Sequence, residues 1–375
     1  MSELEKILTE AMASDTKDVS IFLPRDRSPG FFKETQLAAF IATIGKCRNL
    51  TTVDWHNQWI SEEADEHFCR SLVGINALFH SRSVQNMKGQ QFPMSCDSVL
   101  GNVMCEDGIL EAPDRRGRAT TICAFDSEWG EPPTMANAFN NRERFIDRFR
   151  ELRKGLEFSK LRQPDQDQRH YDAHFCELVY ELYQNTREHG RFGPWIESDG
   201  RRERLEIPGV RFIALRRHFG KHDTFKRYAD GFSELTDYLS TLEFEKQGKE
   251  LNLWEVSIGD IGMGIMERYL DDHRGECSVP QGSEEEIKLI NQILTQSLSS
   301  KQFSGVGKGL RHALKALRLL DGFVSLRTGK QWLCGSKAWG IPMDNEGLRA
   351  VSSGKNLSRV EGTWYNFLFP MPSQK

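Results

Sequence analysis

One helical segment constrains the fold of this chain more than any other stretch. Apolar residues recur at three- and four-residue steps through residues 175–183, which is the pattern of a buried helical stripe. Glu181, Asn185 and His189 are each four residues apart in the same segment, so they stack on one face of the helix. Gly190 is expected to end the helix as its C′ residue.

This helix face carries groups with specific chemistry. Glu181 can take a proton from a nucleophile, and the amide oxygen of Asn185, one turn later, can ligate a hard cation such as Mg²⁺. The same spacing is also typical of a solvated helix face, so these residues alone do not define a site.

A glycine-rich turn with the pattern Asp260-x-Gly262-x-Gly264 follows an apolar strand at residues 253–258 and precedes a helix. Glycines permit positive φ and let the backbone approach a ligand closely. A buried aspartate at the end of a strand is a good acceptor for an exocyclic amine.

A second turn, Gly305-x-Gly307-x-Gly309, opens an apolar helix that reaches residue 320. The free N–H groups at a helix N-terminus favour phosphate. The pattern is neither a Walker A loop nor the dinucleotide fingerprint, because the glycine spacing differs from both. Each turn alone is also typical of ordinary loop geometry.

Taken together and in this order, the three motifs resemble the GHKL superfamily. This superfamily contains the gyrase, heat-shock-90-type chaperone, histidine-kinase and mismatch-repair ATPases, which share the Bergerat nucleotide-binding fold. The matching residues are Glu181-x-x-x-Asn185 as the N box, Asp260-x-Gly262-x-Gly264 as the G1 box, Gly305-x-Gly307-x-Gly309-Leu310 as the G2 box, and Gly362-Thr363 on a late strand. The resemblance covers about residues 140–370.

The resemblance implies that ATP and Mg²⁺ bind here. Asn185 would ligate Mg²⁺, and Asp260 would accept a hydrogen bond from the adenine amine with support from Thr363. Gly262 and Gly264 would shape the adenine pocket.

The resemblance also assigns the phosphate end of the site. Gly305, Gly307 and Gly309 would contact phosphate at the end of a mobile lid that spans about 266–304. Lys301 and Lys308 flank this loop and are candidate phosphate ligands, although solvated lid lysines are equally typical.

Glu181 stands where hydrolytic members of the superfamily carry their general base. Its presence favours activation of a hydroxyl nucleophile, either water or the serine of a partner protein. Asn-x-x-x-His-Gly, ending at His189 and Gly190, resembles the N box of anti-sigma serine kinases, although a histidine also suits a helix C-terminus for structural reasons.

The length of 375 residues allows two domains. Alternating strands and helices at 19–24, 31–47, 50–55 and 62–79 predict a small N-terminal α/β domain with at least one parallel strand pair. A Pro-Pro linker near residue 132 divides the chain into an N-terminal domain at 1–135 and an ATP-binding domain at 136–375 with an insertion at about 217–250. The predicted class is α/β, with a C-terminal two-layer α+β sandwich of helices on a mixed β-sheet.

The bulk properties exclude several functions. A net charge of −4 does not indicate a broad nucleic-acid surface, and no apolar run reaches the roughly 18 residues that a membrane span needs. The N-terminus is acidic and polar, unlike a signal peptide. The eight cysteines are scattered without Cys-x-x-Cys, which favours reduced thiols in a cytoplasmic protein.

Three functions remain open at this point. The first is a Mg²⁺-dependent ATPase that acts as a conformational switch on a protein partner or in a homodimer. The second is an anti-sigma-type serine protein kinase that acts on a small partner protein. The third is a non-catalytic nucleotide-dependent binding module, supported by the basic stretch at residues 115–118.

Overall fold

The computed structural model describes residues 2–14, 17–23, 30–55, 68, 71–86, 109–113, 119–126, 141–156, 166–190, 192–198, 201–207, 209–229, 231–242, 250–273, 278–295, 309–336, 347–352 and 357–371.

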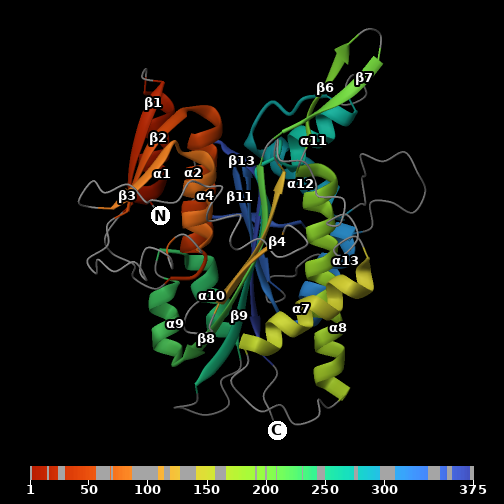
Figure 1. Ribbon diagram of the computed structural model, residues 1–375. Helices are drawn as coiled ribbons and strands as arrows, with labels where there is room; N and C mark the ends of the chain where they lie inside the picture. The colour runs from red at the N-terminus through yellow and green to blue at the C-terminus, as the bar shows by residue number, and fades with distance from the viewer. Residues whose placement is uncertain are drawn as a thin grey trace.

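An eight-stranded antiparallel sheet forms the centre of the molecule (Figure 1). Its strands, in spatial order, are β12 (Arg349–Ala350), β11 (Gln331–Ser336), β10 (Phe323–Gly329), β13 (Val360–Pro370), β9 (Leu251–Asp260), β8 (Gly209–Gly220), β5 (Ala119–Asp126) and β4 (Ile109–Pro113). The sequence predicted a mixed sheet. This prediction was wrong, because each described pairing in the sheet is antiparallel.

The hairpin of β8 and β9 shows why the prediction failed. Gly220 at the end of β8 pairs with Leu251 at the start of β9, so the two strands form one hairpin. The predicted insertion contains α9 (His222–Tyr228) and α10 (Ser233–Thr241) and lies at the closed end of this hairpin. Helices between strands often signal a parallel crossover, whereas here they leave and return at the same end of the sheet.

Helices α7 (Arg142–Leu156), α8 (Gln166–Asn185), α12 (Ser283–Thr295) and α13 (Gly309–Leu319) cover one face of the sheet (Figure 1). Trp254, Val256 and Ile258 alternate toward this layer from β9 and are fully buried. The predicted stripe at 175–183 is the part of α8 that packs on them, and each large apolar side chain buried there contributes about 1.5–3 kcal/mol. The predicted helical stripe is therefore confirmed.

The opposite face of the sheet is also covered. Leu253 from β9 and Leu368 from β13 point away from α8 and pack with α9 and α10. Trp364 of β13 packs with α2 (Lys33–Cys47) of the N-terminal unit. The two-layer sandwich expected from the sequence therefore carries a third layer, because the central strands present apolar side chains on both faces.

The N-terminal unit has its own small parallel sheet. Strands β1 (Asp18–Leu23), β2 (Asn49–Trp55) and β3 (Ser83–Asn86) pair in that order, and both pairings are parallel. Helices α1 (Ser2–Ala13), α2 and α4 (Leu72–His80) belong to the same unit. The predicted parallel strand pair is confirmed.

The predicted boundary at residue 135 does not separate the two units. Strands β4 and β5 lie before it in the sequence, yet β5 pairs with β8 along its whole length in the large sheet. One continuous apolar core also joins Ile41 and Val53 of the N-terminal unit to Phe212 and Trp364 of the large sheet. The N-terminal unit is thus packed onto the sheet rather than joined to it by a linker alone.

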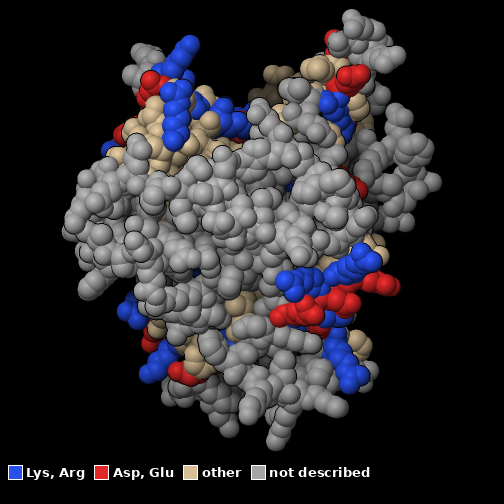
Figure 2. All heavy atoms as spheres, in the orientation of Figure 1, with Lys and Arg blue, Asp and Glu red and all other residues tan. Residues whose placement is uncertain are grey.

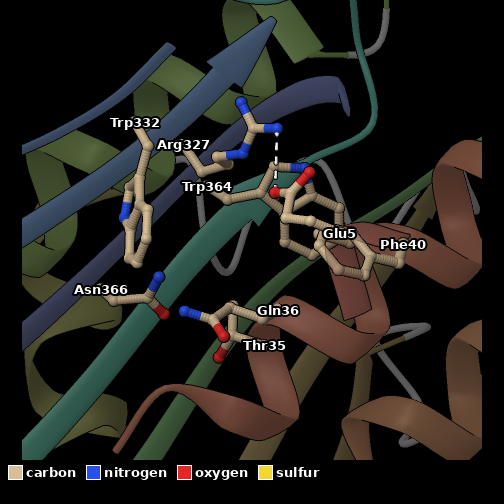
Figure 3. Close-up of a pocket in the computed structure, with 9 residues that line it drawn as sticks. Glu5, Thr35, Gln36, Phe40, Arg327, Trp332, Trp364 and Asn366 are labelled. Carbon is tan, nitrogen blue, oxygen red and sulfur yellow. Dashed lines mark hydrogen bonds and ion pairs between the residues drawn. The ribbon is translucent and has the colours of Figure 1, made fainter. Parts of the chain in front are cut away.

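A small cavity of about 20 Å³ lies where α1 and α2 meet β10 and β13 (Figure 3). Arg327 of β10 and Glu5 of α1 form a buried ion pair of 3.3 Å at its edge. Burial lowers the pKa of Arg327 to about 10. The cavity has room for about one water molecule and lies on the face opposite α8, so this volume is a packing defect at the interface of the two units.

A two-stranded hairpin projects from the end of the helical layer (Figure 1). It consists of β6 (Phe192–Ser198) and β7 (Arg201–Glu206). Trp195 anchors it, because its indole N–H donates to Asp272 at 2.8 Å and its backbone N–H donates to Asp271 at 2.9 Å. Both aspartates end α11 (Ile265–Asp272).

Charged side chains on the visible surface are mixed in sign. Figure 2 shows basic and acidic groups side by side over α7, where Arg148 pairs with Glu151 and Arg150 pairs with Asp147. Exposed pairs of this kind contribute little to stability, about 0–1 kcal/mol each.

Candidate functional site

The C-terminal end of α8 forms one wall of the candidate site. The buried stripe fixes the rotation of the helix, so Glu181 and Asn185 lie away from the core and are only partly buried. After Asn185 the chain adopts a π-helical turn, η1 (Thr186–Gly190). Such turns occur often at functional sites, and this one carries the backbone of Gly190 toward β9.

The start of α13 lies directly against this wall. A Cβ atom built on Gly309 would be 2.7 Å from Oε2 of Glu181 and 3.5 Å from Nδ2 of Asn185. The structure therefore brings together the N box and the last glycine of the G2 box, which are more than a hundred residues apart in the sequence. Leu310, the next residue, packs its partly buried side chain on the apolar core beneath.

Asn185 has an unused donor at this junction. Its Nδ2 atom is buried and has no hydrogen-bond partner among the described residues. An orphaned amide beside the free N–H groups of a helix N-terminus suits an oxygen-rich anion, and the amide oxygen of the same side chain suits Mg²⁺. The residues present thus fit a magnesium–phosphate group.

Asp260 lies at the other end of η1. It ends β9, is 6 % exposed, and accepts a hydrogen bond of 2.9 Å from the backbone N–H of Gly262. A Cβ atom on Gly190 would be 2.5 Å from both Cβ and Cγ of Asp260. A Cβ atom on Gly262 would be 2.7 Å from the carbonyl oxygen of Gly190. Gly190 and Gly262 therefore leave no room for a side chain beside Asp260.

Gly190 has a different role from the predicted one. The helical segment does end at Gly190, but this glycine does not have the positive φ that a left-handed C′ residue adopts. It is required instead because any side chain there would overlap Asp260.

The remaining G1 and strand residues complete the same end of the site. Thr363 of β13 pairs with Asp260 across the sheet and is 7 % exposed. Gly264 has φ of +90° and forms the N-cap of α11, a backbone conformation that favours glycine. Thr328 of β10 accepts a hydrogen bond of 3.2 Å from the N–H of Ile265 and so ties this turn to the sheet.

The two ends of the site are held at a fixed spacing by one helix. Gly190 follows Glu181 by nine positions along α8 and η1, which would span about 13 Å along an α-helix axis. A carboxylate suited to an amine lies at one end, and an amide, a carboxylate and a helix N-terminus lie at the other.

Burial shapes the proton affinity of Glu181. Partial desolvation raises the pKa of this carboxyl above its usual value, while the nearby His312 opposes the shift and Glu177 adds to it. A raised pKa makes the ionised carboxylate a stronger base, which is what a group that accepts a proton in catalysis requires.

The N-terminal unit reaches the Asp260 turn through Lys46. The ammonium group of Lys46, at the end of α2, donates to the carbonyl oxygens of Ile261 at 2.8 Å and of Gly262 at 3.4 Å. It also pairs with Glu361 of β13 at 2.9 Å. Sequence reasoning missed Lys46, because nothing in the pattern of α2 indicates which end of the sheet it meets.

Part of the predicted site lies outside the described residues. This holds for Gly305, Gly307, Lys301 and Lys308, and also for the basic stretch at 115–118. Of the predicted lid at 266–304, the structure describes 266–273 and 278–295, which hold α11 and α12. His312 was also missed, although its position one turn into the helix that follows Gly309 made it a candidate for the phosphate end.

Within the described part of the chain, no helix is long and apolar enough to cross a membrane. Among the described cysteines, Cys176 and Cys334 are buried free thiols, and Cys47 is an exposed free thiol. Searches against protein-family models, curated proteins and solved structures found no match for this chain.

Proposed function

We propose that this chain binds ATP with Mg²⁺ and hydrolyses it, and that the nucleotide acts as a conformational switch. The observation that carries the proposal is the convergence of three distant motifs on α8. Gly309 packs on Glu181 and Asn185, and Asp260 packs on Gly190 at the other end of the same helical segment. The resemblance of these motifs to the GHKL superfamily supports the same reading.

The proposed binding roles follow from the chemistry of each group. Asp260, fixed by the Gly262 N–H, accepts the exocyclic amine of adenine. Nδ2 of Asn185 and the N–H groups at the start of α13 donate to phosphate oxygens. Bound Mg²⁺, ligated by the amide oxygen of Asn185, would offset negative charge on the phosphates.

Glu181 is the proposed general base. It takes a proton from a water molecule as the water oxygen bonds to the terminal phosphorus, and the bond from that phosphorus to the bridging oxygen breaks. ADP leaves with the electron pair of that bond, and Glu181 then releases its proton to solvent.

Two intramolecular contacts support the switch. Lys46 links the N-terminal unit to the carbonyl groups of the Asp260 turn, and Glu361 links the same lysine to the strand that carries Thr363. A nucleotide that changes the turn at Ile261 and Gly262 therefore changes the contacts of α2.

Turnover and binding are measured separately to test this function. Wild-type protein is expected to bind ATP and release phosphate with Mg²⁺, Asp260→Asn to bind weakly, and Glu181→Gln to bind without turnover. Asp237→Asn, an exposed carboxylate on α10 outside the predicted lid, is the matched control and should behave as wild type. Failure of the wild type to bind ATP would refute the proposal, and binding without phosphate release, alone or with a partner, would refute the hydrolytic part.

A second candidate reaction uses the same base. Glu181 is half-buried rather than enclosed, so a serine hydroxyl of a partner protein has access to it, as in the anti-sigma-type kinase alternative. Labelled phosphate transferred to a co-purified protein, instead of released to solvent, distinguishes this reaction from hydrolysis.

A further inference from the structure

Three potential metal ligands from two helices meet beside the phosphate end of the site. Glu177 and Glu181 lie one turn apart on α8, and His312 lies in the first turn of α13. One ligand atom from each side chain lies within 4.8 Å of the other two. The packing of Gly309 against Glu181 brings His312 to the two carboxylates, so the cluster is a consequence of the α8–α13 contact.

The donor set differs from that of the proposed magnesium site. Mg²⁺ prefers oxygen ligands, whereas an imidazole with two carboxylates suits Zn²⁺ and other divalent transition metals. Bonds of about 2.0–2.1 Å to a tetrahedral ion require ligand atoms roughly 3.3 Å apart. Because the ligand atoms lie within 4.8 Å of one another, the cluster has to contract by at most about 1.5 Å, and rotation of two partly buried glutamates and an exposed histidine can supply this.

A cation among the described residues already faces the cluster. Arg142 of α7 lies 3.5 Å from Glu177, and the side chains are 52 % and 34 % exposed. An ion pair this exposed contributes at most about 1 kcal/mol, so it competes weakly with a metal ion.

We propose that Glu177, Glu181 and His312 form a binding site for one divalent transition-metal ion of the Zn²⁺ class. The site stands independently of nucleotide binding. Its effect on activity rests on the proposed function. A metal ion bound to Glu181 prevents this carboxylate from accepting a proton, so Zn²⁺ inhibits ATP turnover.

Metal binding is measured on tag-free, full-length protein without nucleotide, by competition for Zn²⁺ with a chromophoric chelator. One Zn²⁺ per chain is expected for wild type, and at least tenfold weaker binding for His312→Ala and for Glu177→Gln. His170→Ala, an exposed histidine on the same α8 helix, is the matched control and should bind as wild type. Co²⁺ loaded into the wild type should show the visible absorption of a nitrogen- and oxygen-ligated ion, and this absorption should change in His312→Ala.

Absence of stoichiometric Zn²⁺ binding by the wild type would overturn the site, as would equal affinity of wild type and His312→Ala. Because no nucleotide is present, neither result depends on the proposed function. Inhibition of wild-type turnover by Zn²⁺ that is relieved in His312→Ala supports the effect on activity. Equal inhibition of the two proteins refutes the effect on activity.

Discussion

Gly190→Ala is the perturbation whose effect the structure defines best. The added methyl group would be 2.5 Å from Cβ and Cγ of Asp260, whereas ordinary contacts begin at 3.4 Å. Either Asp260 or the backbone of η1 therefore has to move by about 0.9 Å. The φ of Gly190 is not in the left-handed region, so alanine adds no backbone strain and the effect is steric.

Asp260 has little room to retreat. Its strand is paired with β13 at Thr363, and its Oδ1 is held by the N–H of Gly262. Overpacking in such a position costs about 1–3 kcal/mol of stability. Displacing the carboxylate also removes a charge-assisted hydrogen bond to adenine of about 1.5–3 kcal/mol. The affinity for ATP should then fall roughly 10- to 150-fold.

Urea unfolding and the anisotropy of a fluorescent ATP analogue measure the two effects. Gly220→Ala, at the end of β8, is the control, because a Cβ atom there would lie 3.7 Å from Phe225, which is an ordinary contact, and its stability should stay within about 0.5 kcal/mol of wild type. Wild-type stability and wild-type nucleotide affinity in Gly190→Ala would refute the reasoning, since they would mean that Gly190 and Asp260 do not pack as described.

Three further predictions concern other parts of the molecule. Glu181→Gln should lower turnover by about 10²–10⁴-fold with nucleotide affinity retained. Burial raises the pKa of Glu181 in the folded state, so ionisation of this carboxyl opposes folding and the variant should be more stable than wild type at neutral pH. Urea unfolding should show that this difference in stability shrinks as the pH falls to the ordinary carboxyl pKa. Lys46→Met should weaken nucleotide binding and lower stability by about 1–3 kcal/mol, because the Ile261 carbonyl and the Glu361 carboxylate lose a charged donor. Unchanged nucleotide binding would argue against the proposed link between the two units. Glu5→Gln should destabilise the packing of α1 by less than the roughly 3–5 kcal/mol typical of a broken buried ion pair, because Arg327 keeps its hydrogen bonds to backbone carbonyls. The fluorescence of Trp332, which lines the same cavity, should show a lower thermal transition temperature for the variant.

Local patterns predicted much of the secondary structure. The stripe at 175–183 forms part of α8, and the strand before Asp260 is β9. Both were predicted because the spacing of apolar residues along the chain follows the period with which each element buries its side chains. The described residues of the three motifs lie close together for a related reason. Asp260 lies at the end of β9, and Gly309 opens a helix whose start packs on α8. These residues become neighbours once α8 and α13 pack on the sheet that contains β9.

Other features depend on tertiary contacts that no local pattern encodes. The strand order that places β5 beside β8 is decided by pairing over long sequence distances. Strand β7 is almost entirely charged, and Gly193 and Pro194 interrupt β6, so no clear strand pattern marks this hairpin in the sequence. The aspartates at the end of α11 hold it in place. Lys46 and His312 acquire their partners only through the packing of α2 and α13.

A structure of the protein with Mg²⁺ and a non-hydrolysable ATP analogue would show whether nucleotide binds between Asp260 and the start of α13. Adenine is expected at Asp260 and Thr363, phosphates at Asn185 and Gly309, and a water molecule or hydroxyl within hydrogen-bond reach of Glu181. A nucleotide bound elsewhere, or none at saturating concentration, would contradict the proposed function.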